Sequence, residues 1–561
     1  MIKAGETITA PWLRRVLAIG VLAALHSWAI AVMILTEPDL IGKAAFLLAW
    51  GVFNGLWLLL LRRPAASAAL AMTMLMLLIA LSIFKHGILV MTVSFTDILV
   101  LDTDTFWFVL DTYIDLGKYA SIVLLITVPL LVAIFWLDPL RVRSRTTLVG
   151  LIVCFALLAG LSFAVPLDRE QEFIRDSFLS KFARSGATAI VDLVTRGILE
   201  ADARATERLA VIESNECQPT AKLPHIVLIF DESSFDATLM PGIKVRPDYR
   251  QHFRSFDGKE RKLLVEGAGG PSWYTEYNVL TGLSVRSYGR FAESVTRLAA
   301  GHVERGLPHA LRRCGYRTFS MYPYYGAFLG ARQFQTGTGI ERFFDAENLG
   351  GLQKADSHYF DFAVRTITWE RTGAPMFLFV YTAANHFPWN SRYRPDLQSD
   401  WRNLGNRSDV DEYLRRQAMS AEDYSRFIKR LREEFPDESF LVVRFGDHQP
   451  LFAKYFVDPT LEEAAVAKRI QAYDPRYLTT YYAIDTVNFT PADLSSALDT
   501  LDAPYLPLLL LEAAGVPLDS SFEEQKKILQ RCNGLFYACK EGAEARRFNR
   551  LLIDAGLING L

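Results

Sequence analysis

The sequence has almost no net charge and no charged tail. Its 60 lysines and arginines stand against 62 aspartates and glutamates, which leaves a formal charge of −2 over 561 residues. Without a global basic field the chain cannot hold a polyphosphate backbone, so no nucleic acid is expected as a partner. Internal repeats and low-complexity tracts are also missing. With 22% charged and 51% hydrophobic residues, the composition excludes a disordered or collagen-like chain.

Long hydrophobic runs are abundant, and they lie within the first 166 residues. Each is close to the roughly 20 residues that cross about 30 Å of hydrocarbon as a helix. The runs cover residues 12–35, 40–61, 66–84, 119–136 and 147–165. They predict an N-terminal α-helical membrane domain of five transmembrane helices. The first run is longer than a signal-peptide core and has no convincing cleavage site, so we expect it to be retained.

Charges in the short loops predict the orientation of these helices, because lysine and arginine stay on the cytoplasmic side. The cationic clusters that fall on one side are Lys3 with Arg14 and Arg15, Arg62 with Arg63, and Arg141 with Arg143 and Arg145. The alternate loops carry the acidic residues Glu37 and Asp39, then Asp97, Asp102, Asp104, Asp111 and Asp115. An odd number of spans then places the N-terminus in the cytoplasm and the chain after about residue 166 outside it.

Two further segments connect or interrupt these helices. Residues 90–117 mix apolar and acidic positions and are expected along the outer membrane interface, either as a loop with an aromatic anchor or as a lipid-entry surface. Residues 168–213 alternate charged and apolar positions at helical spacing, as expected of amphipathic connecting helices. The predicted division is therefore a membrane domain over 1–166, an amphipathic linker over 167–222 and an outer domain over 223–561.

Cysteine usage fits an outer domain. Cys154 lies in the last apolar run, which leaves Cys217, Cys314, Cys532 and Cys539 outside. Cys532 and Cys539 are close enough in sequence to close a small disulfide loop in an oxidising compartment. A zinc site and free thiols are the alternatives, and no second pair with ligand spacing accompanies these two residues.

The outer domain changes to short apolar runs separated by helical stretches. The predicted strands cover residues 225–230, 262–265, 316–321, 376–381 and 440–445, with helices over 295–314 and 421–435 among the intervening segments. Such alternation predicts an α/β domain with a mostly parallel central sheet. In sheets of this kind the chemistry gathers where the strands end.

Polar residues follow three of these strands. Glu232 comes after the first strand, and Asp447 and His448 come after the fifth. Carboxylate oxygens and an imidazole nitrogen are suitable ligands for a divalent cation. After the second strand a glycine-rich turn and Pro271 lead to Ser272 at or near a helix N-terminus, where an anion is favoured. A metal-activated hydroxyl facing a phosphate suits this set, and an ordinary N-cap is the alternative for Ser272.

The ordered motifs resemble a known family. They are Phe230-Asp231-Glu232-Ser233, Gly270-Pro271-Ser272-Trp273-Tyr274-Thr275-Glu276-Tyr277, Asn385-His386-Phe387-Pro388 and Phe445-Gly446-Asp447-His448. This order, after five apolar runs, resembles the lipoteichoic acid synthase and phosphoglycerol transferase branch of the alkaline phosphatase and sulfatase superfamily. The resemblance implies a C-terminal sulfatase-like α/β domain outside a bacterial cytoplasmic (inner) membrane, on the periplasmic or extracytoplasmic side.

The resemblance also implies residue roles. Glu232, Ser272, Asp447 and His448 would bind one divalent metal ion, with Mn favoured and Zn the alternative. Ser272 stands four residues before Glu276, where the family has a threonine nucleophile, and Thr275 is its rival. His386 would contact the phosphate. Arg332 and Trp273 would complete the substrate-binding set, although Tyr322 and Tyr324 replace a histidine that often precedes that stretch in the family.

The implied activity is transfer of a phospholipid head group through a Ser272 phospho-enzyme. Phosphatidylglycerol or phosphatidylethanolamine would be the donor, and a glycan or glycolipid of the cell envelope the acceptor. Phosphoglycerol is favoured because Asp447-His448 is followed by Gln449-Pro450 rather than the Gly-Glu-Ser of phosphoethanolamine transferases. One alternative is a phosphoethanolamine transferase acting on lipid A or another envelope glycan. A catalytically inactive lipid-binding sensor of envelope synthesis is the alternative of another class, whereas the nucleophile signature of true sulfatases is missing around Ser272.

Overall fold

A computed structural model describes residues 11–89, 91–99, 103–167, 169–202, 204–209 and 217–560. The predicted loop charges at Lys3 and Asp102, and residues 210–216 of the predicted linker, lie outside the described residues. The chain divides into two compact units, one made of Met1–Ile98 and Phe106–Thr195 and the other of Leu99–Thr105 and Arg196–Leu561. Each unit is described by itself below.

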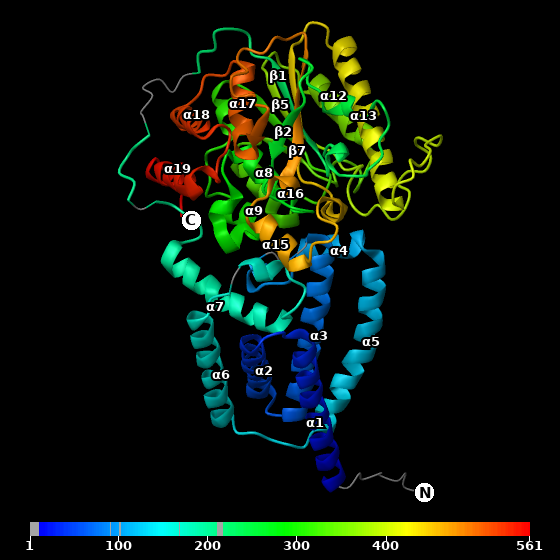
Figure 1. The fold of residues 1–561 in the computed structure, drawn as a ribbon, viewed down its shortest axis with the longest axis vertical. Helices are drawn as coiled ribbons and strands as arrows, with labels where there is room; N and C mark the ends of the chain where they lie inside the picture. Colours follow the sequence, from blue (N-terminus) through cyan, green and yellow to red (C-terminus); the bar gives the residue numbers. More distant parts are fainter. Residues whose placement is uncertain are drawn as a thin grey trace. The chain divides into compact units, whose positions relative to one another are not determined.

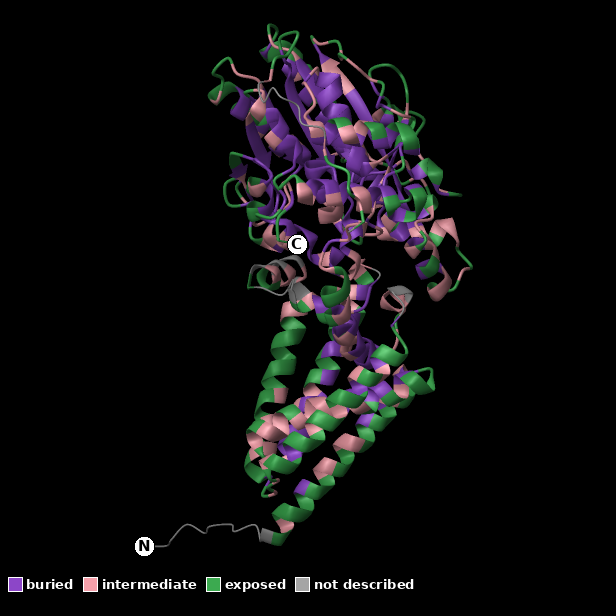
Figure 2. Cartoon of the chain, turned by 90° about the vertical axis from the view of Figure 1, so that its left-hand side faces the viewer, coloured by how far each residue is buried: buried purple, intermediate pink, exposed green. Residues whose placement is uncertain are grey.

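The first unit contains five helices that are long and apolar enough to cross a membrane. They are α1 (Pro11–Thr36), α2 (Leu40–Leu61), α3 (Pro64–Leu89), α5 (Ile114–Leu137) and α6 (Ser144–Ala164). Their outward side chains are largely apolar, with Leu35 and Leu125 exposed by 83% and 75%. Figure 2 shows exposed residues predominating on these helices and buried residues on the strands. The predicted five-helix membrane domain is confirmed.

Local capping explains where these helices begin and end. The Asp39 side chain accepts a hydrogen bond from the Gly42 backbone N–H at 2.6 Å, so α2 starts there. Arg62 adopts a left-handed conformation with φ 57° and ends α2. Asp138 Oδ2 accepts from the Ala65 N–H at 2.8 Å, which ties the loop after α5 to the start of α3. The two loops that carry the predicted cytoplasmic cations are therefore joined.

The segments predicted at the membrane interface are partly helical. Residues 90–117 include a short 3-10 helix, η1 (Phe95–Leu99), and the helix α4 (Thr103–Thr112). Where the structure describes it, the predicted linker contains one amphipathic helix, α7 (Phe178–Arg196), which buries Phe178 and exposes Ile190. Leu199, predicted on a connecting helix, lies outside α7.

The second unit is built on an eight-stranded sheet in the order β4-β3-β5-β1-β6-β7-β2-β8. The strands are β1 (His225–Asp231), β2 (Arg261–Leu264), β3 (Arg317–Met321), β4 (Arg342–Phe344), β5 (Met376–Tyr381), β6 (Phe440–Gly446), β7 (Thr479–Val487) and β8 (Thr500–Asp502). Strand β7 pairs antiparallel with β6 and β2, and the other pairs are parallel. The predicted mostly parallel sheet is confirmed, together with its five predicted strands. The sequence prediction missed β4, β7 and β8.

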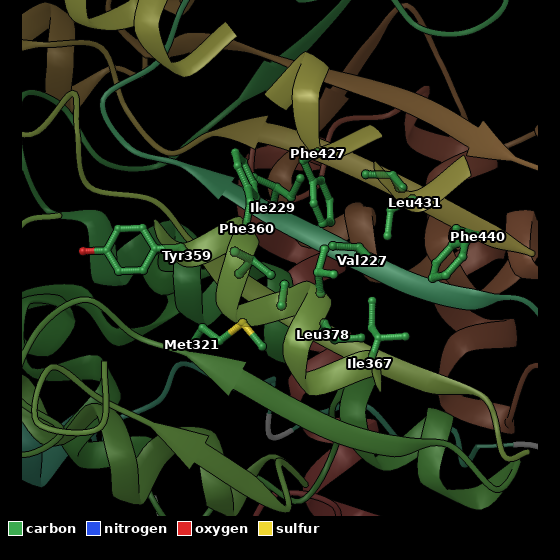
Figure 3. Packing of buried hydrophobic residues seen from close by; sticks show 14 of the residues in the cluster. Val227, Ile229, Met321, Tyr359, Phe360, Ile367, Leu378, Phe427, Leu431 and Phe440 are labelled. Atoms are coloured by element: carbon green, nitrogen blue, oxygen red, sulfur yellow. The ribbon is translucent and has the colours of Figure 1, made fainter. Parts of the chain in front are cut away.

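Helices cover both faces of this sheet, which explains why its central strands are apolar without alternation. On one face, side chains of β1 such as Val227 and Ile229 pack against α12 (Asp356–Trp369) and α13 (Ser408–Glu434), as Figure 3 shows for Phe360 and Phe427. The buried helix α17 (Leu506–Ala514) lies on the opposite side of the sheet (Figure 1). The strand ends are therefore the part of the sheet left open for chemistry.

Two helix predictions need correction. The single helix expected over residues 295–314 is two helices, α9 (Val295–Ala299) and α10 (Leu307–Arg313). Gly301 takes φ 75° between them and Gly306 is extended, so the backbone leaves the helical region at both positions. The helix expected over residues 421–435 is only the second half of α13.

Candidate active site

Three buried side chains converge where two neighbouring strands end. Glu232 follows β1, and Asp447 and His448 follow β6. The two strands are parallel partners, with Asp231 opposite Gly446, so their carboxyl ends lie side by side. One ligand atom from each of Glu232, Asp447 and His448 lies within 4.8 Å of the others. The structure thus brings together three of the four residues that were predicted as metal ligands.

His448 is held in the tautomer that a metal ligand requires. Its Nδ1 lies 2.9 Å from the Gln449 carbonyl oxygen, and only an N–H can make that hydrogen bond. The lone pair is therefore on Nε2, which lies 3.2 Å from Asp447 Oδ2 and 3.8 Å from Glu232 Oε1. A backbone carbonyl that orients the far ring nitrogen is the usual support for a ligating histidine.

The charges in this cluster are unbalanced. Burial, and then the charge of Asp447, raise the pKa of Glu232 well above its usual range. Burial also raises the pKa of Asp447. Glu232 Oε2 and Asp447 Oδ2 are buried and receive no hydrogen bond from the described residues. Two mutually repelling carboxylates with vacant oxygens beside an imidazole lone pair fit a divalent cation.

Ser233 links the two carboxylates, a role that the sequence did not indicate although Ser233 ends the first motif. Its backbone N–H donates to Asp447 Oδ1 at 2.7 Å, and its hydroxyl donates to Glu232 Oε1 at 2.8 Å. Ser233 takes φ 53°, an uncommon conformation for a residue with a side chain. The Tyr413 hydroxyl donates to its carbonyl at 3.0 Å and stabilises this turn. A strained residue between two ligands is typical of functional sites.

Gly446 allows the two strand ends to approach. A Cβ atom at this position would overlap the carbonyl oxygen of Ser234, so only glycine fits. The Thr480 hydroxyl donates to the Gly446 carbonyl at 2.7 Å and fixes the same turn. The glycine in the Phe445-Gly446-Asp447-His448 motif is thus required by packing of the β1 turn against β6.

Ser272 lies beside the cluster, as the first residue of α8 (Ser272–Thr281). Pro271 occupies the N-cap position, so the alternative interpretation of Ser272 as an ordinary N-cap is wrong. Its Oγ lies 3.3 Å from His448 Nε2. Gly269, with φ 82°, forms a parallel bridge to Pro450, which brings the glycine-rich turn alongside the loop after β6.

The two neighbours of Ser272 on the same helix are engaged elsewhere. Thr275 is buried, and its hydroxyl donates to the Asp447 carbonyl at 2.6 Å. Glu276 is buried and accepts from Gln335 Nε2 at 2.9 Å, and burial raises its pKa to about 8. Thr275 therefore positions the ligand loop, and Glu276 keeps its proton at neutral pH.

His386 follows β5 in a buried turn. Its Nδ1 lies 2.6 Å from the Phe387 carbonyl oxygen, so this nitrogen carries the proton. Burial lowers its pKa to about 4, so the ring is neutral at physiological pH. The Tyr324 ring lies 5.5 Å away, centroid to centroid.

The two remaining predicted substrate residues are held by the protein. The guanidinium of Arg332, half exposed, pairs with Asp345 and lies 4.8 Å from the centre of the Phe343 ring. The indole N–H of Trp273 donates to the Glu293 carbonyl at 3.0 Å. Neither side chain belongs to the group of buried ligands, so their substrate contacts stay predictions.

Behind Glu232 lies a buried network that the sequence prediction missed. Asp231 accepts hydrogen bonds from His252 Nε2 at 2.9 Å and from the Tyr481 hydroxyl. Burial opposes the charge of Asp231, but the hydrogen bonds from His252 and Tyr481 lower its pKa below the usual value. Arg444 on β6 donates to His252 Nδ1 at 3.1 Å. Strand alternation turns Asp231 away from Glu232, and the network holds it there.

The four cysteines of the second unit form two disulfides. Cys532 pairs with Cys539, and Cys217 pairs with Cys314 across 97 residues. Cys154 of α6 is the free cysteine among the described residues.

Most of the second unit matches a known protein family. Residues 224–475 match the family model described as Sulfatase, which confirms the superfamily indicated by the sequence motifs. A Rhizobium meliloti protein, provisionally named as a cyclic β-1,2-glucan modification protein, is 23% identical over 236 residues, which are 40% of this chain and 36% of that one. The chain spans less than half the length of the curated relatives that it matches.

Solved structures show lower identity. The Streptococcus pyogenes phosphoglycerol transferase GacH, in complex with sn-glycerol-1-phosphate, is 14% identical with a TM-score of 0.45, and the match covers 59% of this chain and 85% of that one. The lipooligosaccharide phosphoethanolamine transferase EptA of Neisseria meningitidis, an integral membrane protein, is 11% identical with a TM-score of 0.45. That match covers 90% of this chain and 96% of EptA.

Proposed function

Since residues 224–475 match the family model described as Sulfatase, we propose that this protein is a membrane-bound phosphotransferase that moves a phospholipid head group, with phosphoglycerol favoured. The observation that carries the proposal is the position of Ser272. Its hydroxyl lies at a helix N-terminus, 3.3 Å from a histidine that belongs to the buried acidic cluster. A nucleophile, an anion-favouring helix end and a cation-binding cluster are the parts that phosphoryl transfer needs.

Glu232, Asp447 and His448 would hold one divalent metal ion, with Ser272 as a further ligand. Carboxylate and hydroxyl oxygens with one nitrogen suit Mn²⁺, which we favour, and also Zn²⁺. When bound, the ion would supply positive charge that stabilises the phosphoryl oxygens and makes the serine hydroxyl more acidic. The vacant oxygens of Glu232 and Asp447 support this assignment.

In the first step, Ser272 Oγ would attack the phosphorus of phosphatidylglycerol. An Oγ–P bond forms, the P–O bond to diacylglycerol breaks, and the diacylglycerol oxygen takes up a proton in exchange for the one that the Ser272 hydroxyl releases. The product on the protein is a Ser272 phosphoglycerol ester. The backbone N–H groups at the start of α8 favour the negative phosphoryl oxygens there.

In the second step, an acceptor hydroxyl would attack the same phosphorus and break the Oγ–P bond; the acceptor releases one proton, and Ser272 Oγ takes up one as it leaves. The neutral His386 suits this step, because its Nε2 has a lone pair that can take the acceptor proton. Arg332, with a half-exposed guanidinium, would contact the head group. A glycan or glycolipid of the cell envelope is the proposed acceptor, in keeping with the name of the Rhizobium meliloti relative.

The proposed location is a bacterial inner membrane with the second unit on the outer, periplasmic side. The loop cations around α2, α3, α5 and α6 support a cytoplasmic N-terminus. The two disulfides support an oxidising compartment for the second unit.

Two alternatives to this function predict different results. A phosphoethanolamine transferase acting on lipid A or another glycan would use the same residues with another donor. A lipid-binding sensor would need no nucleophile beside the acidic cluster, and the convergence of Ser272 with His448 favours an enzyme.

Intact mass spectrometry of the full-length protein tests the proposal. After incubation with Mn²⁺ and phosphatidylglycerol, we expect one phosphoglycerol adduct that maps to Ser272 and is lost in Ser272→Ala. Thr275→Val, the matched control, should keep the adduct on Ser272, because Thr275 only supports the Asp447 loop. An adduct on Thr275, or one from phosphatidylethanolamine alone, would overturn the nucleophile or the donor. No adduct in metal-loaded protein would contradict the enzyme proposal.

A further inference from the structure

We propose that the second unit binds a neutral glycan in a cleft separate from the metal ligands. The cleft has a volume of about 560 Å³ and lies between residues 246–254, residues 398–404, α13 and β6. This volume is in the range of small-molecule sites in proteins. The metal ligands and Ser272 are not among the residues that line it.

The charged side chains of this cleft are neutralised within the protein. The pairs are Arg246 with Asp248 at 3.2 Å, Arg254 with Glu260 at 3.1 Å, Glu422 with Arg426 at 3.0 Å and Arg444 with Asp485 at 3.2 Å. A phosphate or a metal ion needs uncompensated charge of the opposite sign. The cleft does not provide it, so its charge balance favours an uncharged ligand.

The other lining residues suit a sugar. They provide the aromatic rings of Tyr249 and Trp401 and the amides of Gln251 and Gln398. Aromatic rings present flat apolar faces, against which the C–H face of a sugar ring can pack. Amide groups both donate and accept hydrogen bonds, as sugar hydroxyls require. Apolar faces and amides with balanced charge match a neutral polyhydroxylated ligand better than a lipid tail.

Some residues that line the cleft are near residues of the proposed active site. Arg444, which lines it, stands three residues before Asp447, so their Cα atoms are at most about 10 Å apart. Gln417, also lining it, donates to Ser234 Oγ at 3.1 Å, in the turn that follows Glu232. A glycan held in the cleft would stay near the transferred head group. Its role as acceptor rests on the proposed function, whereas its binding does not.

Binding to the full-length protein tests the inference directly. The protein is held in a polyoxyethylene detergent, because maltoside head groups are themselves sugars. Isothermal titration calorimetry then measures a neutral glucan hexasaccharide and, separately, sn-glycerol-1-phosphate, both against metal-free protein. We expect the hexasaccharide to bind and sn-glycerol-1-phosphate not to bind. The metal is left out so that binding in the cleft is measured apart from binding at the proposed site of phosphoryl transfer.

Two variants locate the binding. Ala421→Met fills the cleft from α13 without removing a contact, and Lys429→Met, on an exposed position of the same helix, is its control. Trp401→Ala removes an aromatic face, and Trp369→Ala, an exposed tryptophan outside the cleft, is its control. We expect each cleft variant to weaken hexasaccharide binding at least tenfold and each control to change it less than twofold.

The outcomes separate the two proposals. No hexasaccharide binding by the unsubstituted protein, or equal binding by both cleft variants and their controls, would overturn the glycan cleft. Binding of sn-glycerol-1-phosphate that Ala421→Met abolishes would also overturn it, in favour of an anion site. Glycan binding in a protein that forms no Ser272 adduct would support the cleft and contradict the transferase proposal.

Discussion

The repulsion between Glu232 and Asp447 makes a testable prediction about Glu232→Gln. Their ligand oxygens lie within 4.8 Å of each other in a buried cluster. Two unit charges at that separation repel by about 3.5 kcal/mol at an effective dielectric constant of about 20. Glutamine keeps the shape of the side chain and removes the charge. We therefore expect the metal-free variant to be more stable than the metal-free parent by up to about 3.5 kcal/mol, and to bind metal more weakly.

Thermal unfolding of the full-length protein, with chelator and with Mn²⁺, measures both effects. Metal-free Glu232→Gln should melt up to about 7 °C above the metal-free parent, at roughly 2 °C per kcal/mol. Mn²⁺ should raise the melting temperature of the parent but scarcely that of the variant, because a hundredfold loss of affinity removes about 2.7 kcal/mol.

Glu276→Gln is the matched control for this experiment. Glu276 is also buried, but its pKa of about 8 leaves it protonated at neutral pH, and Gln335 can still donate to the new amide oxygen. The metal-dependent rise should therefore persist in this variant. A Glu232→Gln protein that is less stable without metal, or that keeps the full metal-dependent rise, would refute the electrostatic reasoning.

Three further predictions concern other parts of the second unit. Gly446→Ala should destabilise the protein by more than about 2 kcal/mol and abolish the metal-dependent rise in melting temperature. The reason is that the alanine Cβ would overlap the Ser234 carbonyl oxygen. An unchanged rise would contradict the close packing of Gly446 against the β1 turn. Burial raises the pKa of Asp356 from 3.8 to about 7, so the folded state binds more protons between these values and stability falls by about 4 kcal/mol as the pH rises from 4 to 7. Asp356→Asn should flatten that pH dependence in melting curves, and equal slopes would disprove the assignment. The double variant Cys217→Ser and Cys314→Ser should have a lower melting temperature than the parent in the absence of reductant. The Cys217–Cys314 disulfide closes a loop of 97 residues, and removing it takes away about 4.7 kcal/mol of stabilisation that comes from the restricted entropy of the unfolded chain. Equal melting temperatures under those conditions would contradict this prediction.

Patterns local in the chain were predicted well. Apolar runs long enough to span a bilayer identify the five membrane helices, because helix length and hydrophobicity depend only on neighbouring residues. Continuous apolar runs likewise identify β1, β5 and β6, since strands buried on both faces need no alternation. Strand β7 was missed because its Thr-Thr-Tyr-Tyr start is not an apolar run.

Residues that act through distant partners were not predicted. Ser233 ends the first motif without an indicated role, and only the pairing of β1 with β6 places its N–H against Asp447. His252 has no neighbour in sequence that indicates its bond to Asp231. The division of 295–314 into two helices depended on glycine conformations that helical periodicity does not reveal.

The sequence by itself determined the membrane helices, the α/β character of the outer part and the residue types available for chemistry. Composition and periodicity are properties of neighbouring residues, and strand ends follow from them. Only the tertiary structure decided that Glu232, Asp447 and His448 share one buried site with Ser272 beside it. It also decided which ring nitrogen of His448 is free and which charges of the cleft are paired. These features depend on contacts between segments far apart in the chain, and such contacts exist only after the sheet has formed.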